Sequence, residues 1–142
     1  MPKNSDNYFF IQGPVLMKKT PDAFQIRSKI WIEDGNGKVI FGLGRFRILS
    51  TIERCGSINA AAKELKMSYR ALWGKIRTTE EALGCSLLVR ATGGAAGGGS
   101  ALTPLARTLL AHFHAIHQQV NNQADRSFEK KFIPELRPSG KK

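Results

Sequence analysis

The sequence predicts a single, mainly α-helical domain with a small amount of β structure. Its 142 residues are enough for one hydrophobic core. Hydrophobic residues make up 42% and charged residues 23% of the chain, which is the composition of a folded protein. Apolar residues recur at the three- and four-residue spacing of helices, and short β-forming runs lie between these segments. These observations favour a helical core with small β elements attached.

The amino-terminal region changes character at Ser28. Residues 1–27 keep neither a helical nor a strand period for long, so we expect an irregular arm there. After it, β-forming residues alternate between two faces, and a turn-forming run at residues 34–37 leads into the β-forming residues 39–41. This pattern predicts a β-hairpin.

Three helices are expected to follow the hairpin. The first carries an apolar stripe and ends at Gly56, because glycine is favoured just after a helix. Ser57 and Ser68 each precede helix-forming residues and are expected to cap the second and third helices. A tight turn therefore separates these two helices, and the third one ends at Gly84.

A strand, a loop, a second strand and a long helix come next. The β-forming residues 87–89 and 101–103 flank a glycine-rich run. Thr103, which a proline follows, marks the start of a fourth helix that runs to about Ala124. The order of all these elements is that of a winged helix-turn-helix, with the glycine-rich run as the wing.

The charge of the chain indicates the kind of partner. There are 22 Lys and Arg residues against 11 Asp and Glu residues, which gives a net charge of +11 and favours a polyanionic partner. We expect a winged helix-turn-helix domain at residues 28–124, between the irregular arm 1–27 and a basic, frayed C-terminal tail 125–142.

Two stretches, GSINAAAKELKMSYRALWGKI and LLVRATGGAAGGGSALTPLA, resemble the DNA-binding domain of the molybdate-responsive regulator (ModE) family. The resemblance covers about residues 28–124, and SINAAAKEL is similar, more loosely, to LysR-type regulators. It implies a dimeric winged-helix transcription factor. Full-length members of that family also carry C-terminal molybdate-binding domains, whereas 18 residues follow Ala124 here, so we expect no molybdate binding by this chain.

The third helix is expected to enter the major groove of DNA with its amino-terminal end first. Arg70 is the main candidate for specificity, because a guanidinium can bind O6 and N7 of guanine together. Lys75 and Arg77 lie farther along the helix and are expected to contact phosphates. The full set of residues expected to contact DNA is Ser57, Asn59, Ser68, Tyr69, Arg70, Lys75, Arg77, Arg90, Thr92, Gly93, Gly94 and Ser100.

The fourth helix carries apolar residues at alternating spacings of three and four. Such a seam usually packs against a partner helix, so we expect the chain to form a homodimer through it. The residues expected to form this dimer contact are Leu109, Phe113, Ile116 and Val120.

No metal site or disulfide is expected. Of the three histidines in the fourth helix, His114 and His117 share a face, and one such pair is too few ligands for a structural metal. Cys55 and Cys85 lack the spacing of a zinc or redox motif, so both are expected to be reduced thiols.

The sequence also offers no catalytic arrangement. The glycine-rich run is one residue short of a nucleotide-binding P-loop, because Gly99 stands where that motif needs its lysine. Glu80 and Glu81 are adjacent and are expected to lie on an exposed face rather than to form an acid–base pair. We therefore expect a protein that is not an enzyme and uses no cofactor.

The function that fits these features is sequence-specific binding of double-stranded DNA by a dimeric, ModE-like transcriptional regulator. Two alternatives stay open: a nonspecific architectural DNA-binding protein, and a protein-interaction module that uses the C-terminal helix. No run of about 18 apolar residues and no secretory signal occurs, so we expect a cytoplasmic protein without membrane contact.

Overall fold

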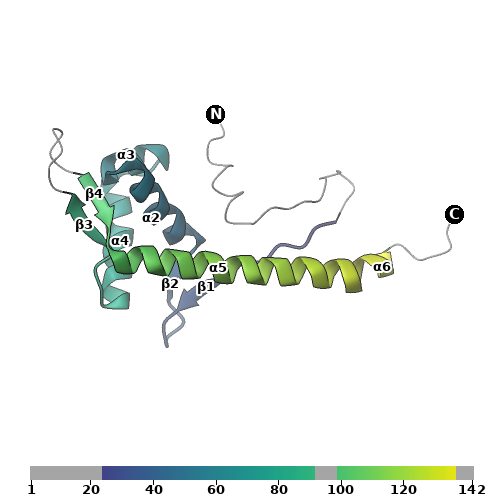
Figure 1. The fold of residues 1–142 in the computed structure, drawn as a ribbon. Coiled ribbons are helices and arrows are strands. Elements are labelled where there is room, and N and C mark those ends of the chain that lie inside the picture. Colours follow the sequence, from purple (N-terminus) through teal and green to yellow (C-terminus); the bar gives the residue numbers. More distant parts are fainter. Residues whose placement is uncertain (1–23, 92–98, 137–142) are drawn as a thin grey trace. The chain divides into compact units, whose positions relative to one another are not determined.

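The computed structural model describes residues 24–91 and 99–136 of the chain (Figure 1). Contacts between residues divide the chain into two units. The winged unit comprises residues 30–113. The helical extension comprises, within the described ranges, residues 24–29 and 114–136. Among the described residues, no helix combines the length and the apolar character needed to cross a bilayer.

The winged unit begins with the predicted hairpin. Strands β1 (Trp31–Glu33) and β2 (Val39–Gly42) pair antiparallel, with an irregular register next to Glu33. Asp34 closes the turn, because its carboxylate accepts hydrogen bonds from the backbone N–H groups of Asn36 (2.8 Å) and Lys38 (2.9 Å). These two bonds lower the pKa of Asp34 below its ordinary value.

Three helices follow: α2 (Leu43–Cys55), α3 (Ile58–Glu64) and α4 (Tyr69–Leu83). Gly56 and Gly84 end α2 and α4 with φ values of 77° and 69°, a left-handed conformation that glycine adopts without steric cost. The predicted helices and their stops are confirmed.

Strands β3 (Leu88–Ala91) and β4 (Gly99–Leu102) form the second antiparallel pair (Figure 1). The glycine-rich residues 92–98 between them lie outside the described residues. Thr103 connects β4 to helix α5 (Pro104–Ser127): its hydroxyl accepts from the Ala106 N–H (3.1 Å) and donates to the Ser86 carbonyl (2.9 Å). The element order confirms the winged helix-turn-helix fold.

Helix α2 is shared by the two apolar clusters of the winged unit. Its Leu49 joins a cluster built from β2, β4 and the start of α5, and its Ile48 and Ile52 join a cluster built from α3 and α4. The alanines that α3 contributes are fully or almost fully buried, and their small side chains allow close helix packing. The buried residues are, in the first cluster, Ile40, Phe41, Leu49, Leu87, Leu102, Ala106 and Phe113, and in the second, Ile48, Ile52, Ile58, Ala61, Ala62, Leu72 and Ile76.

The helical extension is longer and more regular than the sequence analysis expected. Helix α5 continues past Ala124, and a π-helical turn η1 (Phe128–Phe132) and a last turn α6 (Ile133–Leu136) follow, so residues 125–136 are not a frayed tail. Phe128 and Phe132 stack at 5.2 Å between ring centroids, which supports this turn. In a regular α-helix, the ring of Pro134 would clash with the carbonyl group four residues before it. The wider π-helical turn precedes this proline.

Candidate nucleic-acid interface

Two serine caps fix the starts of the helices of the helix-turn-helix. Ser57 Oγ accepts from the Ala60 N–H (3.1 Å), and Ser68 Oγ accepts from the Ala71 N–H (3.0 Å). Both serines were predicted as DNA contacts as well as caps. Capping uses a lone pair of each oxygen, so the hydroxyl hydrogen is still able to donate to an incoming phosphate.

The turn between α3 and α4 contains the one strained residue of the described backbone outside glycine. Lys66 has φ 55°, a left-handed conformation that costs a non-glycine residue about 1–2 kcal/mol. The N–H of the next residue, Met67, donates to the Ala62 carbonyl (2.9 Å) and closes the turn. The exposed Lys66 lies two residues before Ser68, the N-cap of α4.

Helix α4 has a buried side and an exposed side. Leu72, Ile76 and Thr79 are buried. At about 100° per residue, Arg70 and Arg77 fall within about 20° of each other on the opposite face, and Lys75 lies about 140° from Arg70. The structure therefore brings Arg70 and Arg77 onto one surface and places Lys75 on a separate flank.

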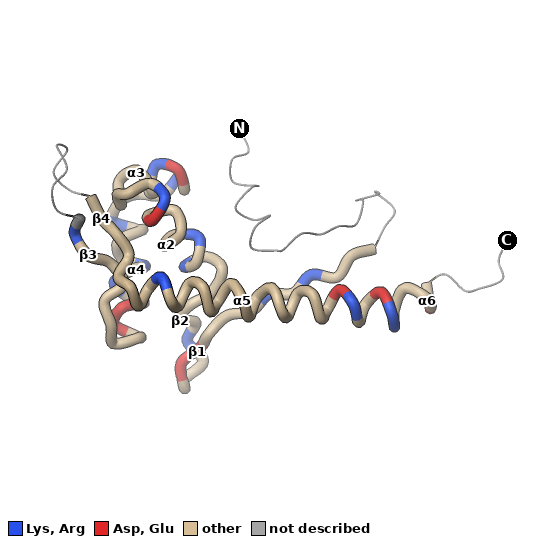
Figure 2. The backbone as a smooth tube through the Cα atoms, in the orientation of Figure 1, with Lys and Arg blue, Asp and Glu red and all other residues tan. Residues whose placement is uncertain are grey.

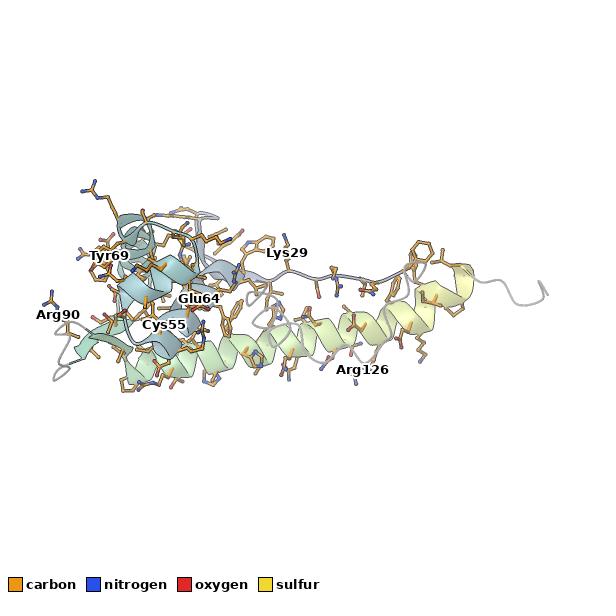
Figure 3. All side chains as sticks on the ribbon, turned by 90° about the horizontal axis from the view of Figure 1, so that it is seen from above. Lys29, Cys55, Glu64, Tyr69, Arg90 and Arg126 are labelled. Carbon is orange, nitrogen blue, oxygen red and sulfur yellow. The ribbon has the colours of Figure 1, made fainter. Side chains whose placement is uncertain are left out.

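The other predicted α3 and α4 residues are also at the surface. Asn59 is exposed on α3, and 49% of the Tyr69 side chain is exposed at the start of α4. Trp73 is half-buried against the α2–α3–α4 cluster. Figure 3 labels Tyr69 on the ribbon of α4.

The wing strands carry two further predicted contacts. Arg90 is exposed on β3 and extends away from the ribbon (Figure 3), opposite Ser100 in the β-ladder. The Ser100 N–H donates to the Gly56 carbonyl at the end of α2 (2.8 Å), which ties the wing to the helical core. The predicted contacts Thr92, Gly93 and Gly94 lie outside the described residues.

Two glutamates that the sequence analysis did not assign to the wing hold its strands. Glu80 Oε1 accepts from the backbone N–H groups of Leu87 (2.8 Å) and Leu88 (3.4 Å) at the start of β3. Glu53 accepts from the Leu102 N–H (3.3 Å) at the end of β4 and pairs with Arg107 (2.9 Å). The expectation that Glu80 only forms an exposed face is wrong, because its carboxylate accepts hydrogen bonds from the backbone N–H groups of Leu87 and Leu88.

In the winged unit, acidic side chains are bound by other groups of the unit, whereas several exposed basic side chains form no ion pair. Its acidic side chains bind within the unit: Glu64 pairs with Arg54, Glu81 pairs with Arg77 (3.7 Å), and Glu53, Glu80 and Asp34 bind backbone N–H groups. Across residues 24–91 and 99–136, no ion pair involves five other exposed cations of the helix-turn-helix and β3. Figure 2 shows Lys and Arg on α4 and near the end of β3. These cations are Lys63, Lys66, Arg70, Lys75 and Arg90.

The four residues predicted for the dimer contact separate into two pairs. Phe113 is buried, with its ring 5.1 Å from Phe41 and 5.8 Å from Phe46, and Leu109 packs against the same cluster. Both therefore contribute to the core of the winged unit. In the helical extension, Ile116 is 52% and Val120 is 36% exposed. The predicted seam is available to a partner at the second pair.

The remaining sequence candidates do not form a reactive site in the described part of the chain. Glu64 accepts a hydrogen bond from the Cys55 thiol (3.1 Å), and Figure 3 shows the two residues close together. Burial first, and then this hydrogen bond, raises the pKa of Cys55, which keeps the thiol protonated. Within residues 24–91 and 99–136, no group of three metal-ligating side chains is present.

The part of the chain that contains this interface is similar to known proteins. Residues 43–107 match the family described as bacterial regulatory helix-turn-helix protein, lysR family. The chain is 41% identical over 86 residues to the molybdenum transport protein ModE of Azotobacter vinelandii, covering 61% of this chain and 32% of that protein. It is 47% identical over 66 residues to the transcriptional regulator ModE of Haemophilus influenzae, covering 46% of this chain and 26% of that protein.

The chain spans about a third or less of the length of these relatives. A solved structure of the CbnR_DBD–DNA complex is also similar, with a TM-score of 0.48 and 24% identity, covering 61% of this chain and 94% of that one. The family match over residues 43–107 and the ModE relatives confirm the resemblance to ModE and LysR-type sequences inferred above.

Proposed function

We propose that this chain is a ModE-like regulator of transcription that binds specific sequences of double-stranded DNA. The observation that carries the proposal is the exposed face of α4, where Arg70 follows the serine-capped helix start and forms no ion pair within the described residues. Such a face suits phosphates and base edges, which both attract guanidinium groups. A relative named as a transcriptional regulator ModE is 47% identical to the chain over 66 residues.

In the proposed complex, α4 lies in the major groove with its amino-terminal end towards the bases. Arg70, in the first turn of α4, donates to O6 and N7 of a guanine. Lys63, Lys66 and Lys75 bind phosphates, which gives affinity without sequence preference. Arg90, at the end of β3, binds the backbone that flanks the groove, and Glu53 and Glu80 keep the wing strands in place for this contact.

Specificity is tested by selecting a site from random duplex DNA and then measuring binding to the selected and the scrambled duplex. Arg70→Ala should weaken binding to the selected site by about 1–3 kcal/mol and relax the preference at one base pair. Arg126→Ala, which removes an exposed cation from α5, is the matched control and should keep the preference. Equal losses on both duplexes would reduce Arg70 to a phosphate contact.

The same measurements separate the alternatives. Wild-type protein that binds selected and scrambled DNA equally, with a steep loss of affinity as salt rises, would be a nonspecific architectural protein. Protein that binds neither duplex would fit the interaction-module alternative. We place the active protein in the cytoplasm and expect it to bind without molybdate; calorimetry with molybdate and with sulfate checks the second expectation.

We further propose that the active form is a homodimer joined through the exposed residues of the helical extension. Ile116 and Val120 are apolar and exposed, and two joined copies would place half-sites about one helical turn of DNA, or a multiple, apart. The double variant Ile116→Asp and Val120→Asp should sediment as a monomer with an unchanged winged unit. Gln119→Asp, at an exposed polar position between them, is the control. Monomeric wild-type protein at micromolar concentration would contradict the dimer.

A further inference from the structure

Helix α4 contains a glycine in its middle, and the packing and backbone conformation of the helix do not require a glycine there. Gly74 is exposed, its φ is not positive, and a β-carbon built on it would meet nothing within 4 Å. Glycine in a helix interior destabilises the helix relative to alanine, because the unfolded chain gains conformational freedom. No packing contact or backbone conformation in the described structure offsets this loss.

The position of Gly74 is informative. It lies on the same exposed face as Arg70 and Arg77, four residues after the first and three residues before the second. The two arginines are about 10 Å apart along the helix axis, which equals about three base-pair steps of DNA. Gly74 therefore leaves a gap between two long cationic side chains, near the middle of the three base-pair steps between them.

The backbone carbonyl at the gap accepts an additional hydrogen bond. A helix position without a side chain leaves the neighbouring backbone carbonyl oxygens exposed. Such an oxygen would repel a phosphate or the acceptor atoms of a base. The Thr78 hydroxyl donates to the Gly74 carbonyl (2.8 Å), in addition to the bonding of the helix itself. This extra donor reduces the negative potential of that oxygen.

We infer that Gly74 is the point of closest approach between α4 and DNA, where a base-pair edge contacts the helix backbone directly. This inference rests on the proposed DNA-binding function and adds to it the residue that sets the depth of α4 in the major groove. Any side chain at position 74 would hold the helix away from the bases and lengthen the contacts of Arg70 and Arg77.

The inference predicts that stability and affinity change in opposite directions. Gly74→Ala should raise the melting temperature of the free protein by about 4 °C, since alanine is the better helix former. The same variant should bind the selected duplex about tenfold more weakly, and Gly74→Leu about a hundredfold more weakly, as expected for overpacking a contact. Thermal unfolding followed by circular dichroism and fluorescence anisotropy with labelled duplex measure the two quantities.

Two controls match the chemistry of these changes. Gly44→Ala alters another exposed helical glycine with nothing within 4 Å, in α2, and should leave affinity unchanged. Ala82→Leu places the same side chain at an exposed residue near the end of α4, and it should weaken binding less than twofold.

The outcomes distinguish this inference from the function on which it rests. Wild-type protein that shows no preference for the selected duplex would overturn both. Wild-type protein that prefers the selected duplex, together with a Gly74→Ala variant of equal or higher affinity, would overturn the role of Gly74 alone. A Gly74→Ala variant with a lower melting temperature would also overturn it, because the glycine would then have a structural purpose.

Discussion

The winged unit and the helical extension differ in the side chains that they bury. The winged unit buries apolar residues in two clusters that share α2. In the described part of the extension, the buried side chains are the polar His117 and Asn121, whereas apolar residues such as Ile116 and Phe132 are exposed. The first unit therefore has an apolar core of its own, whereas the described part of the second leaves apolar side chains exposed.

The polar interior of the extension is a connected set of side chains. Ser28 Oγ donates to Asn121 Oδ1 (2.5 Å), and Asn121 Nδ2 lies 3.1 Å from His117 Nδ1. An amide nitrogen donates only, so Nδ1 of this histidine accepts. Hydrogen bonds fix geometry but contribute modest net stability, which is why this region is expected to open more readily than the winged unit.

The largest effect on the free energy of unfolding is expected at one of two apolar positions on α5, which we compare. Phe113→Ala should destabilise the protein by about 3–5 kcal/mol, because it leaves a cavity beside Phe41 and Phe46. Ile116→Ala removes an exposed side chain and should change monomer stability by less than about 0.5 kcal/mol. Chemical denaturation at low protein concentration measures both. Similar losses would show that the two units do not differ in their interiors.

A smaller effect is expected at the wing. Glu80→Ala removes the acceptor for the Leu87 and Leu88 N–H groups and should cost about 1–3 kcal/mol of unfolding free energy. Glu81→Ala removes only an exposed ion pair with Arg77 and should cost less than about 1 kcal/mol. Hydrogen exchange at Leu87 and Leu88 should accelerate in the first variant alone. Unchanged exchange there would remove Glu80 from the support of the wing.

In the extension, Asn121→Ala should act locally. It removes the partner of Ser28 and of His117 Nδ1, at a cost of about 1 kcal/mol. Amides of residues 24–29 should exchange faster, while those of the winged unit keep their protection. Global unfolding of the winged unit in this variant would show that the two regions are not separately stable.

The smallest effect concerns the turn at Asp34. Backbone hydrogen bonds lower the pKa of Asp34 below its ordinary value of 3.8. The carboxylate therefore stabilises the turn fully at pH values above that ordinary pKa, and this contribution is lost as the pH falls through the lower pKa of the folded state. The stability difference between wild type and Asp34→Ala should therefore be present at neutral pH and shrink on acidification. A difference that grows in acid would contradict the role of the carboxylate.

Local signals made most of the fold predictable. The caps Ser57, Ser68 and Thr103 and the helix-ending Gly56 and Gly84 act within a few residues of their own position. Their neighbours along the chain supply the groups that they bind, so a sequence pattern was sufficient. The exposed face of α4 followed in the same way, because helical periodicity separates Arg70 from the buried Leu72 and Ile76.

Long-range contacts decided the rest. Glu80 and Glu53 resemble surface residues in the sequence, and only the folded chain brings strand N–H groups to their carboxylates. Phe113 and Ile116 belong to one apolar pattern on one helix, yet the rings of Phe41 and Phe46 cover the first and leave the second exposed. Periodicity tells which residues share a face of a helix. What covers that face depends on side chains far away in the sequence, and those are placed by the tertiary structure.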